Sequence, residues 1–394
     1  MKGNNMGRVL KALAVSMAVG LGMTACSRDY TVGYLYVTNA KATPGVITAY
    51  AIDYQSGALI QLSDSPISSG GNNPVTLAAS PNGLFLYVIN QGTSTVVEFA
   101  INPDGTITTK NTYSVVTGNA TSSPTALAID PAGKFLYVTY QHQTGSTGPG
   151  GLASFPINAD GSLGTALAAV ALGNNPSGIA IPATGGFVYV IDQESPLTSS
   201  AHGVLLAYSE NTSTGVLTPI VGSYNSGVAA GTTPSAIAED PSGHFIYVTD
   251  EATNQLYGYT VQTGGAPLAM LNSPFTAGLY PVSIKVDPRG TFVYVANFAS
   301  STVSVYVINT ATGALSGASG GAAVATGPTC VTIDPAIGIY LYTSNNTDNS
   351  VSAEQLDPHS GALKQVQGSQ FSSQAGPTCA VAVANGAHAT QIVE

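Results

Sequence analysis

Titratable side chains gather in three loops of this 394-residue chain, each loop following a similar segment about 50 residues after the last. The loops read YQHQTGSTGPGG, DQESPLTSSAHG and DEATNQ, and they carry His142, Asp192, Glu194, His202, Asp250 and Glu251. Carboxylate and imidazole groups are ligands that divalent cations take in proteins, and they also bind polar molecules. The alternative is a solvated acidic rim on long loops.

Two more charges interrupt short apolar segments, Glu239 in PSAIAED and Lys285 in PVSIKVD. A buried charge without a partner is costly, which favours an ion pair between neighbouring strands. The alternative is a pair of catalytic groups that lines a channel.

The common nucleophile and metal motifs are missing from the sequence. It holds five histidines without metal-type spacing and no G-x-S-x-G segment. Cys330 has no basic neighbour in the sequence that would lower its pKa. These observations disfavour hydrolases of those types, and no cofactor is evident beyond the cation that the three loops could hold.

The loops are positioned by a repeated aromatic segment of the type FLYVTN, which ends in Asn or Asp in most copies. Seven copies recur at intervals close to 50 residues, and a period of this length built from short alternating strands is typical of propeller blades. Their central tyrosines are Tyr36, Tyr87, Tyr137, Tyr189, Tyr247, Tyr294 and Tyr342. The sequence therefore predicts an all-β, seven-bladed β-propeller with four antiparallel strands per blade.

A short strand led by proline comes before each aromatic segment except the first. Two residues after its proline, this strand always carries a residue that is small, which suits the crowded axis of a propeller. These residues are Thr76, Ala126, Gly178, Ala236, Ser283, Cys330 and Cys379.

The last strand led by proline, PTCAVAV, has no aromatic segment after it, while the first aromatic segment has no such strand before it. We expect the C-terminal strand to complete the N-terminal blade, which closes the ring and removes its free sheet edges. Cys330 and Cys379 then lie on neighbouring inner strands, either as a disulfide or as two buried thiols.

The N-terminus has the features of an export signal. Basic residues precede the apolar run ALAVSMAVGLG, and MTAC follows, which resembles the lipobox of bacterial lipoproteins. We expect a signal peptide over residues 1–25, lipid attachment at Cys26, a linker over 26–29 and one propeller domain over 30–394. The alternative is an ordinary signal peptide that leaves Cys26 as a free thiol.

Charged residues make up 8% of the chain and hydrophobic residues 44%, with a net charge of −10. This balance fits a folded protein rather than a disordered one. It offers no basic patch for phosphates, which excludes nucleic-acid binding. We expect contact with a membrane only through the lipid anchor, on the periplasmic or cell-surface side.

The YVTN and YVAN strands with their DPxG turns resemble the YVTN family of propellers and the lactonase-like clan that includes 6-phosphogluconolactonases. This resemblance implies hydrolysis of a sugar lactone, with Arg or His beside the leading prolines. Here Val75, Ser235 and Val282 follow those prolines, and Glu251 alone matches the pattern of the clan. We therefore expect a monomeric binding or scaffold module for an envelope protein, a glycan or a small ligand. The alternative is a lactone hydrolase with Glu251 as a candidate catalytic residue.

Overall fold

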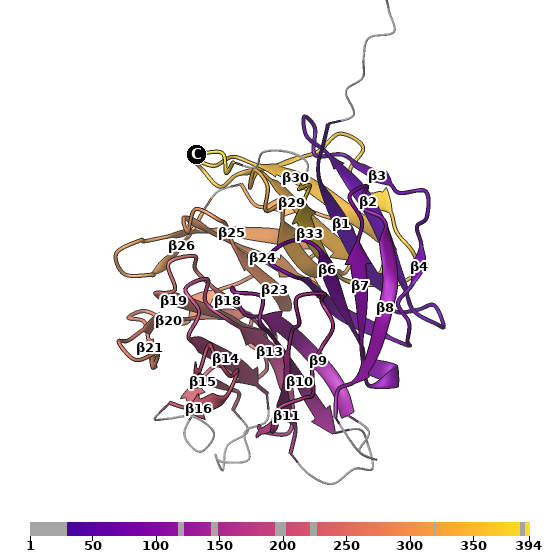
Figure 1. Ribbon diagram of the computed structural model, residues 1–394. Helices are drawn as coiled ribbons and strands as arrows, with labels where there is room; N and C mark the ends of the chain where they lie inside the picture. Colours follow the sequence, from indigo (N-terminus) through magenta and orange to yellow (C-terminus); the bar gives the residue numbers. More distant parts are fainter. Residues whose placement is uncertain are drawn as a thin grey trace, which may run out of the picture. The chain divides into compact units, whose positions relative to one another are not determined.

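The computed structural model describes residues 30–116, 122–142, 149–193, 202–220, 227–318, 320–386 and 391–394. The chain divides into two compact units, Met1–Tyr30 and Thr31–Glu394, and the second unit carries all of the strands described. These strands form seven antiparallel sheets, confirming an all-β propeller of seven blades (Figure 1). Apart from the short 3-10 helix η1 (Gln91–Thr93), the described ranges hold no helix, so none there is long and apolar enough to span a membrane.

The innermost strand of each blade lines the axis and packs against the innermost strands of both neighbouring blades. Its proline lies at or near the start of the strand, where a fixed φ and a missing N–H are tolerated. From blade 1 to blade 7 these strands are β33 (Pro377–Ala384), β5 (Pro74–Ala79), β9 (Ser122–Ile129), β13 (Pro176–Ala180), β18 (Pro234–Glu239), β23 (Pro281–Val286) and β28 (Pro328–Ile333).

The aromatic segments form the second strand of each blade and are almost completely buried, because neighbouring blades cover both of their faces. In the same order they are β1 (Thr31–Asn39), β6 (Phe85–Asn90), β10 (Phe135–His142), β14 (Phe187–Asp192), β19 (Phe245–Asp250), β24 (Phe292–Asn297) and β29 (Tyr340–Asn345).

The third strands continue each sheet outwards. They are β2 (Val46–Asp53), β7 (Thr95–Ile101), β11 (Gly151–Pro156), β15 (Val204–Glu210), β20 (Gln255–Val261), β25 (Thr302–Ile308) and β30 (Ser350–Leu356).

The outermost strand is continuous in blade 2, as β8 (Ile107–Ser114), and is a short β12 (Val170–Ala171) in blade 3. In the other five blades it is divided into two short strands that pair with the same third strand. These pairs are β3 (Leu59–Gln61) with β4 (Ile67–Ser68), β16 (Leu217–Pro219) with β17 (Val228–Ala229), β21 (Pro267–Ala269) with β22 (Phe275–Thr276), β26 (Leu315–Gly317) with β27 (Ala322–Ala323), and β31 (Leu363–Gln365) with β32 (Phe371–Ser372).

The two ends of the propeller meet in blade 1, where the C-terminal strand β33 pairs antiparallel with β1. Leu35 lies opposite Ala382 and Tyr36 opposite Val381. Figure 1 shows the yellow strand β33 alongside the indigo strand β1. The predicted closure of the ring by the C-terminal strand is therefore confirmed.

One hydrogen bond recurs at all seven interfaces between blades. The central tyrosine of each aromatic strand is fully buried, and its hydroxyl lies within hydrogen-bond distance of a glycine carbonyl in the turn that follows the third strand of the next blade. In blade 3 the Tyr137 hydroxyl also donates to the Glu210 carboxylate, at the shorter distance of 2.7 Å. The O–O distances run from 2.6 to 3.4 Å. The pairs are Tyr36–Gly105, Tyr87–Gly161, Tyr137–Gly215, Tyr189–Gly265, Tyr247–Gly313, Tyr294–Gly361 and, across the closure, Tyr342–Gly57.

The acceptor position of this contact requires glycine. All seven acceptor glycines have a positive φ, which is +71° at Gly57. A Cβ on Gly57 would also overlap the ring of Tyr340, the aromatic residue two positions before Tyr342. Each aromatic strand therefore fits a turn of the next blade by both a hydrogen bond and ring packing.

A second contact between blades lies beside the axis. The residue after the leading proline is Ser or Thr in five blades, and its hydroxyl donates to the proline carbonyl of the next blade at 2.7 to 3.2 Å. The donors are Thr125, Ser177, Ser235, Thr329 and Thr378. The next residue is small because space is limited. A Cβ on Gly178, for example, would lie 3.0 Å from Ile191 Cδ1 and 3.2 Å from Ile237 Cγ2.

We predict that Gly57→Ala lowers the free energy of unfolding by about 1–3 kcal/mol, because alanine disfavours a positive φ and its methyl group displaces Tyr340. Urea denaturation followed by tyrosine fluorescence measures this change. Gly317→Ala is the matched control, since a Cβ there meets no atom within 4 Å. Equal stability of the two variants would contradict the role given to the glycine contact.

Candidate functional site

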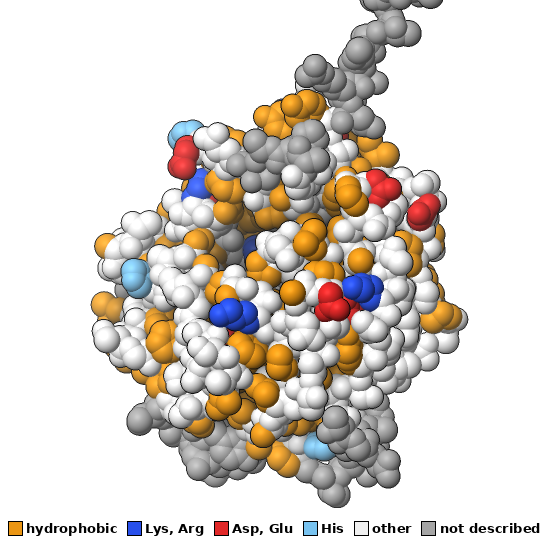
Figure 2. All heavy atoms as spheres, viewed as in Figure 1, with side chains coloured by type: hydrophobic (Ala, Val, Ile, Leu, Met, Phe, Trp, Pro, Cys, Tyr) orange, Lys and Arg blue, Asp and Glu red, His pale blue; other side chains and the backbone are white. Residues whose placement is uncertain are grey.

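The axis of the propeller opens at two ends, which differ in chemistry. We call the end at the leading prolines, where the loops after the aromatic strands lie, the loop mouth; Gln193 and Glu251 are there. We call the opposite end, formed by the DPxG turns such as residues 240–243, the turn mouth. The face in Figure 2 carries few charged side chains and is hollowed near its middle.

Asp192 and Asp250 end their aromatic strands at the loop mouth, and both are fully buried. The carboxylate of Asp250 accepts hydrogen bonds from the N–H groups of Thr232, Thr233 and Ala252 and from the Thr253 hydroxyl. Asp192 accepts one from the N–H of Asn175. These bonds fasten the loops to the strands, and they use all four acceptor positions of Asp250.

The two histidines of the predicted site do not share one environment. His202 is exposed, whereas His142 is half-buried with its ring against Tyr140 at 6.2 Å, and Glu194 lies outside the described residues. No cluster of three or more His, Cys, Asp or Glu side chains within the described ranges could hold a metal ion. The cation or ligand site across all six residues stays a prediction.

Glu251 is the half-buried carboxyl of the loop mouth. Burial raises the pKa of Glu251, and the negative charge of the neighbouring Asp250 adds to that rise. The hydrogen bond with the Tyr280 side chain opposes it. Tyr280 is 43% exposed, and its ring lies 6.0 Å from the ring of Phe298, the residue that follows strand β24. The loop mouth thus places a carboxyl with a raised pKa beside the Tyr280 ring, which in turn lies near the Phe298 ring.

Amide side chains surround the rest of this mouth. Gln91, Gln193 and Asn346 follow their aromatic strands, and each donates to the leading proline carbonyl of the next blade at 3.4, 3.1 and 3.0 Å. Beside that proline, Ser235 directs its hydroxyl to the Pro281 carbonyl. The positions where the resemblance implies Arg or His are therefore apolar or occupied by interblade contacts here.

Glu239 and Lys285 lie at the turn mouth, on the adjacent strands β18 and β23. They belong to the lining of a cavity of about 370 Å³. Burial raises the pKa of Glu239, and the nearby Lys285 ammonium opposes that rise. Lys285 is exposed, and within the described part of the chain neither side chain takes part in an ion pair shorter than 4.0 Å.

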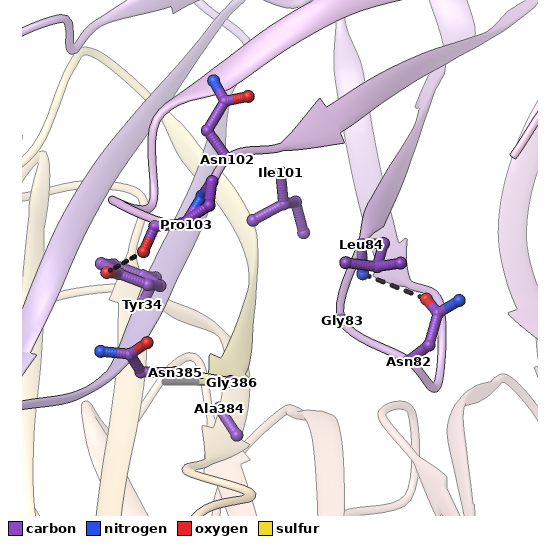
Figure 3. Close-up of a pocket in the computed structure, with 10 residues that line it drawn as sticks. All are labelled: Tyr34, Asn82, Gly83, Leu84, Ile101, Asn102, Pro103, Ala384, Asn385 and Gly386. Carbon is purple, nitrogen blue, oxygen red and sulfur yellow. Dashed lines mark hydrogen bonds between the residues drawn. The ribbon is translucent and has the colours of Figure 1, made fainter. Parts of the chain in front are cut away.

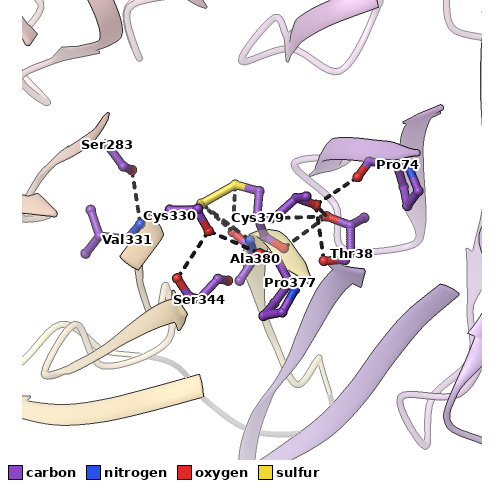
Figure 4. Close-up of a disulfide and its surroundings, with 11 residues drawn as sticks. Thr38, Pro74, Ser283, Cys330, Val331, Ser344, Pro377, Cys379 and Ala380 are labelled. Carbon is purple, nitrogen blue, oxygen red and sulfur yellow. Dashed lines mark hydrogen bonds between the residues drawn. A yellow bond between two sulfur atoms is a disulfide. The ribbon is translucent and has the colours of Figure 1, made fainter. Parts of the chain in front are cut away.

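Cys330 and Cys379 form a disulfide between the innermost strands β28 and β33, with their Cα atoms 4.9 Å apart (Figure 4). The bond joins blade 7 to the C-terminal strand of blade 1, so it crosses the closure of the ring. Neither sulfur is a free thiol for nucleophilic chemistry.

A different cavity, of about 430 Å³, lies between blades 1 and 2 (Figure 3). It is lined by Tyr34, Asn82, Leu84, Ile101 and Asn385 among others, without a charged side chain. The Tyr34 hydroxyl already donates to the Pro103 carbonyl at 3.0 Å. Its lining therefore has no acid or base that could transfer a proton near neutral pH.

Comparison with known proteins adds a family match and a fold match. The family model described as "Lactonase, 7-bladed beta-propeller" matches residues 27–112, 77–222 and 200–333, which together span most of the chain. No curated protein is similar in sequence at a significant level.

Solved structures match this fold at low sequence identity. A Bacteroides fragilis protein named as a candidate 6-phosphogluconolactonase has a TM-score of 0.74 and 18% identity, with 91% of this chain and 99% of that chain covered. The periplasmic gluconolactonase of Pseudomonas aeruginosa has a TM-score of 0.71 and 17% identity, over 89% and 99% of the two chains. Hydrazine synthase of Kuenenia stuttgartiensis also matches, with a TM-score of 0.59 and 15% identity over 85% and 98%. Likeness at this level shows the fold alone.

Glu354 is a carboxyl with a raised pKa that lies in the third strand of blade 7, away from both mouths. Six blades place an aromatic residue at its position in the third strand, and blade 7 has this fully buried carboxyl instead. The aromatic residues are Tyr50, Phe99, Phe155, Tyr208, Tyr259 and Tyr306. Among the described residues neither oxygen of Glu354 has a hydrogen-bond partner, and burial raises its pKa to about 8. With no access to ligand, this carboxyl affects stability rather than chemistry.

We predict that the stability of the protein falls as the pH rises from about 4.5 to about 8. The folded protein holds a proton on Glu354 up to about pH 8, while the unfolded chain releases it near the ordinary value of 4.5. The expected slope is on the order of 1.4 kcal/mol per pH unit within that window. Thermal melting in a buffer series measures it, and Glu354→Gln should flatten the curve, whereas Asp64→Asn on the surface should not. An unchanged slope in Glu354→Gln would refute this account.

Proposed function

Because this chain belongs to the lactonase family of seven-bladed β-propellers, we propose that it is an exported hydrolase that opens sugar lactones at its loop mouth. The observation that carries the proposal is the group formed by Glu251, Tyr280 and Phe298. It is the place at the loop mouth where a titratable group with a raised pKa meets partly exposed aromatic rings. Such a combination of a few polar groups with aromatic walls is typical of small-molecule sites.

The aromatic rings supply the binding surface in this proposal. Tyr280 and Phe298 lie on the ends of blade 6, and the exposed part of the Tyr280 ring can stack on the apolar face of a sugar ring. Glu251 belongs to blade 5, so the bound lactone would sit between the two blades.

The carboxylate of Glu251 would act as a general base. It takes a proton from a water molecule, whose oxygen attacks the lactone carbonyl carbon and forms a tetrahedral oxyanion. When the oxyanion collapses, the ring C–O bond breaks, and the proton passes to the departing alkoxide to give a hydroxy acid. Because the pKa of Glu251 is raised toward neutral pH, its carboxylate is a stronger base than an ordinary one. The Tyr280 hydroxyl holds it in place.

A second candidate function is a non-catalytic module that binds a sugar, a sugar acid, a glycan or an envelope protein at the same mouth. It is favoured by the residues beside the leading prolines, where Val75 and Val282 are apolar and Ser235 is committed to the Pro281 carbonyl. Since none of these three residues has a positively charged side chain, a lactone bound beside them would have no such group to stabilise its oxyanion.

We further propose that the protein works outside the cytoplasm as a monomer held by a lipid on Cys26. The disulfide Cys330–Cys379 supports an oxidising compartment, and a structural relative from Pseudomonas aeruginosa is periplasmic. The lipid anchor itself rests on the MTAC segment of the sequence. Mass spectrometry of the mature N-terminus tests it.

We predict that the purified protein hydrolyses gluconolactone faster than the spontaneous reaction, as measured by acid release in a pH-stat. Glu251→Gln should lower kcat/KM by about 100-fold or more, since it removes the base, and Tyr280→Phe by a smaller factor. The exposed Asp104→Asn is the matched control and should leave the rate unchanged.

Lactone binding without turnover in calorimetry would favour the second candidate over the hydrolase. Turnover that survives Glu251→Gln would contradict the site, and absence of both turnover and binding would contradict both functions.

A further inference from the structure

The turn mouth holds a cavity of about 370 Å³ that is separate from the loop mouth. Blades 4, 5, 6, 7 and 1 all contribute to its lining, which includes Glu239, Lys285, Thr332, Ile333 and Val381. Lys285 follows Pro281 by four residues in the extended strand β23, so about 13 Å separates it from the loop-mouth end. A small ligand at one mouth therefore shares no contact with a small ligand at the other.

Two side chains of opposite charge line this cavity without forming an ion pair with each other. Glu239 and Lys285 are the only charged residues in the seven strands that line the axis, all of which are described. Among the described residues neither side chain forms an ion pair within 4.0 Å or a hydrogen bond to another side chain, and the Glu239 carboxyl bonds its own backbone. A carboxyl and an exposed ammonium that face one hollow without pairing with each other are a reason to look for a ligand.

The neighbouring carboxylates show the contrast. Asp240, Asp287 and Asp334 lie in the DPxG-type turns beside the same cavity, and their oxygens accept hydrogen bonds from backbone N–H groups of those turns. They are nearly fully buried and hold the turns in shape. Glu239 and Lys285 have no such structural task, although burial has a cost for Glu239.

We propose that the turn mouth binds a small hydroxycarboxylate, with its carboxylate on the Lys285 ammonium and a hydroxyl group hydrogen-bonded to Glu239. The carbon chain of the ligand lies against the side chains of Val286, Ile333 and Val381. This site goes beyond the proposed function, because it uses no residue of the loop mouth.

The charges select this class of ligand. A single ammonium matches a single carboxylate, whereas phosphates are usually bound by clustered Arg and Lys side chains. A ligand with several negative charges would be repelled by Glu239, and a neutral sugar would leave Lys285 without a partner. A hydroxyl can donate its hydrogen to Glu239 or accept the proton of its acid form, so the contact persists in both protonation states.

The apolar walls and the size of the cavity agree with this choice. Val286, Ile333, Val381 and Ala382 offer carbon surface to the body of the ligand, and a volume of about 370 Å³ is within the range of small-molecule pockets. The hydroxy acids released by lactone hydrolysis have this chemistry, but the assignment depends on the turn-mouth residues alone.

Isothermal titration calorimetry with three probes tests the proposal on the full chain: gluconate, hexanoate and glucose. Gluconate should bind more tightly than hexanoate, and glucose should not bind at the turn mouth. Lys285→Met should weaken gluconate binding at least tenfold, because the carboxylate loses its counter-charge. Lys364→Met, which removes an exposed lysine on the outer strand β31, is the matched control and should change nothing.

For Glu239→Leu the informative quantity is the ratio of gluconate to hexanoate affinity. Removal of a negative charge near Lys285 strengthens the binding of any carboxylate, so a single affinity would not show the role of Glu239. The ratio of gluconate to hexanoate affinity should fall about tenfold in this variant, because only gluconate loses a hydrogen bond. An unchanged ratio would overturn the role of Glu239.

Separate outcomes distinguish this site from the loop mouth. Glu251→Gln should leave gluconate binding intact, and Lys285→Met should leave lactone turnover intact. If Lys285→Met loses no gluconate site, or if Glu251→Gln loses every gluconate site, the proposal is overturned. Because Lys285 is exposed and unpaired, we expect Lys285→Met to fold; if its melting temperature falls, Lys285→Gln replaces it in the same assay.

Discussion

Each blade of this propeller is fastened to the next by a buried tyrosine that donates to the carbonyl of a glycine with a positive φ. Tyr342 and Gly57 make this contact across the closure at 2.9 Å, within the range of the six other pairs. A blade therefore supplies half of each of its two interfaces, and a chain with free ends would leave one tyrosine and one glycine turn unmatched. The pairing of β33 with β1 and the Cys330–Cys379 disulfide strengthen the same closure.

This ring dictates where chemistry can occur. Close packing restricts the axis to small residues and commits most polar groups near it, such as the Ser235 hydroxyl and the Asp250 carboxylate, to contacts within the scaffold. Among the described residues near the axis, we single out two places where polar groups are available for a ligand. Glu251 lies beside aromatic rings at the loop mouth, and Glu239 and Lys285 face the cavity of the turn mouth.

The sequence predicted the number of blades and the closure because the tyrosine repeat and the extra C-terminal strand are local patterns. It did not reveal the glycine partner of each tyrosine, since that turn lies in the next blade and about 70 residues away along most of the chain. Glu251 was recognised from its neighbours in sequence, whereas Tyr280 and Phe298 were not, because their contact depends on how two strand ends meet. The burial of Asp192 and Asp250 had a detectable signal. Both stand at the position that Asn occupies in four other blades, where the side chain also forms hydrogen bonds within the scaffold.

Hydrogen exchange of the native protein, followed by mass spectrometry of peptides, tests the closed ring most directly. If the tyrosine–glycine contacts join all blades into one cooperative unit, the amides of β33 and β1 exchange only with the global opening, as slowly as those of β18 and β19 in mid-chain. Exchange of β33 and β1 long before β18 and β19 would contradict the account, because it would mean that the ring opens at its closure while the rest stays folded.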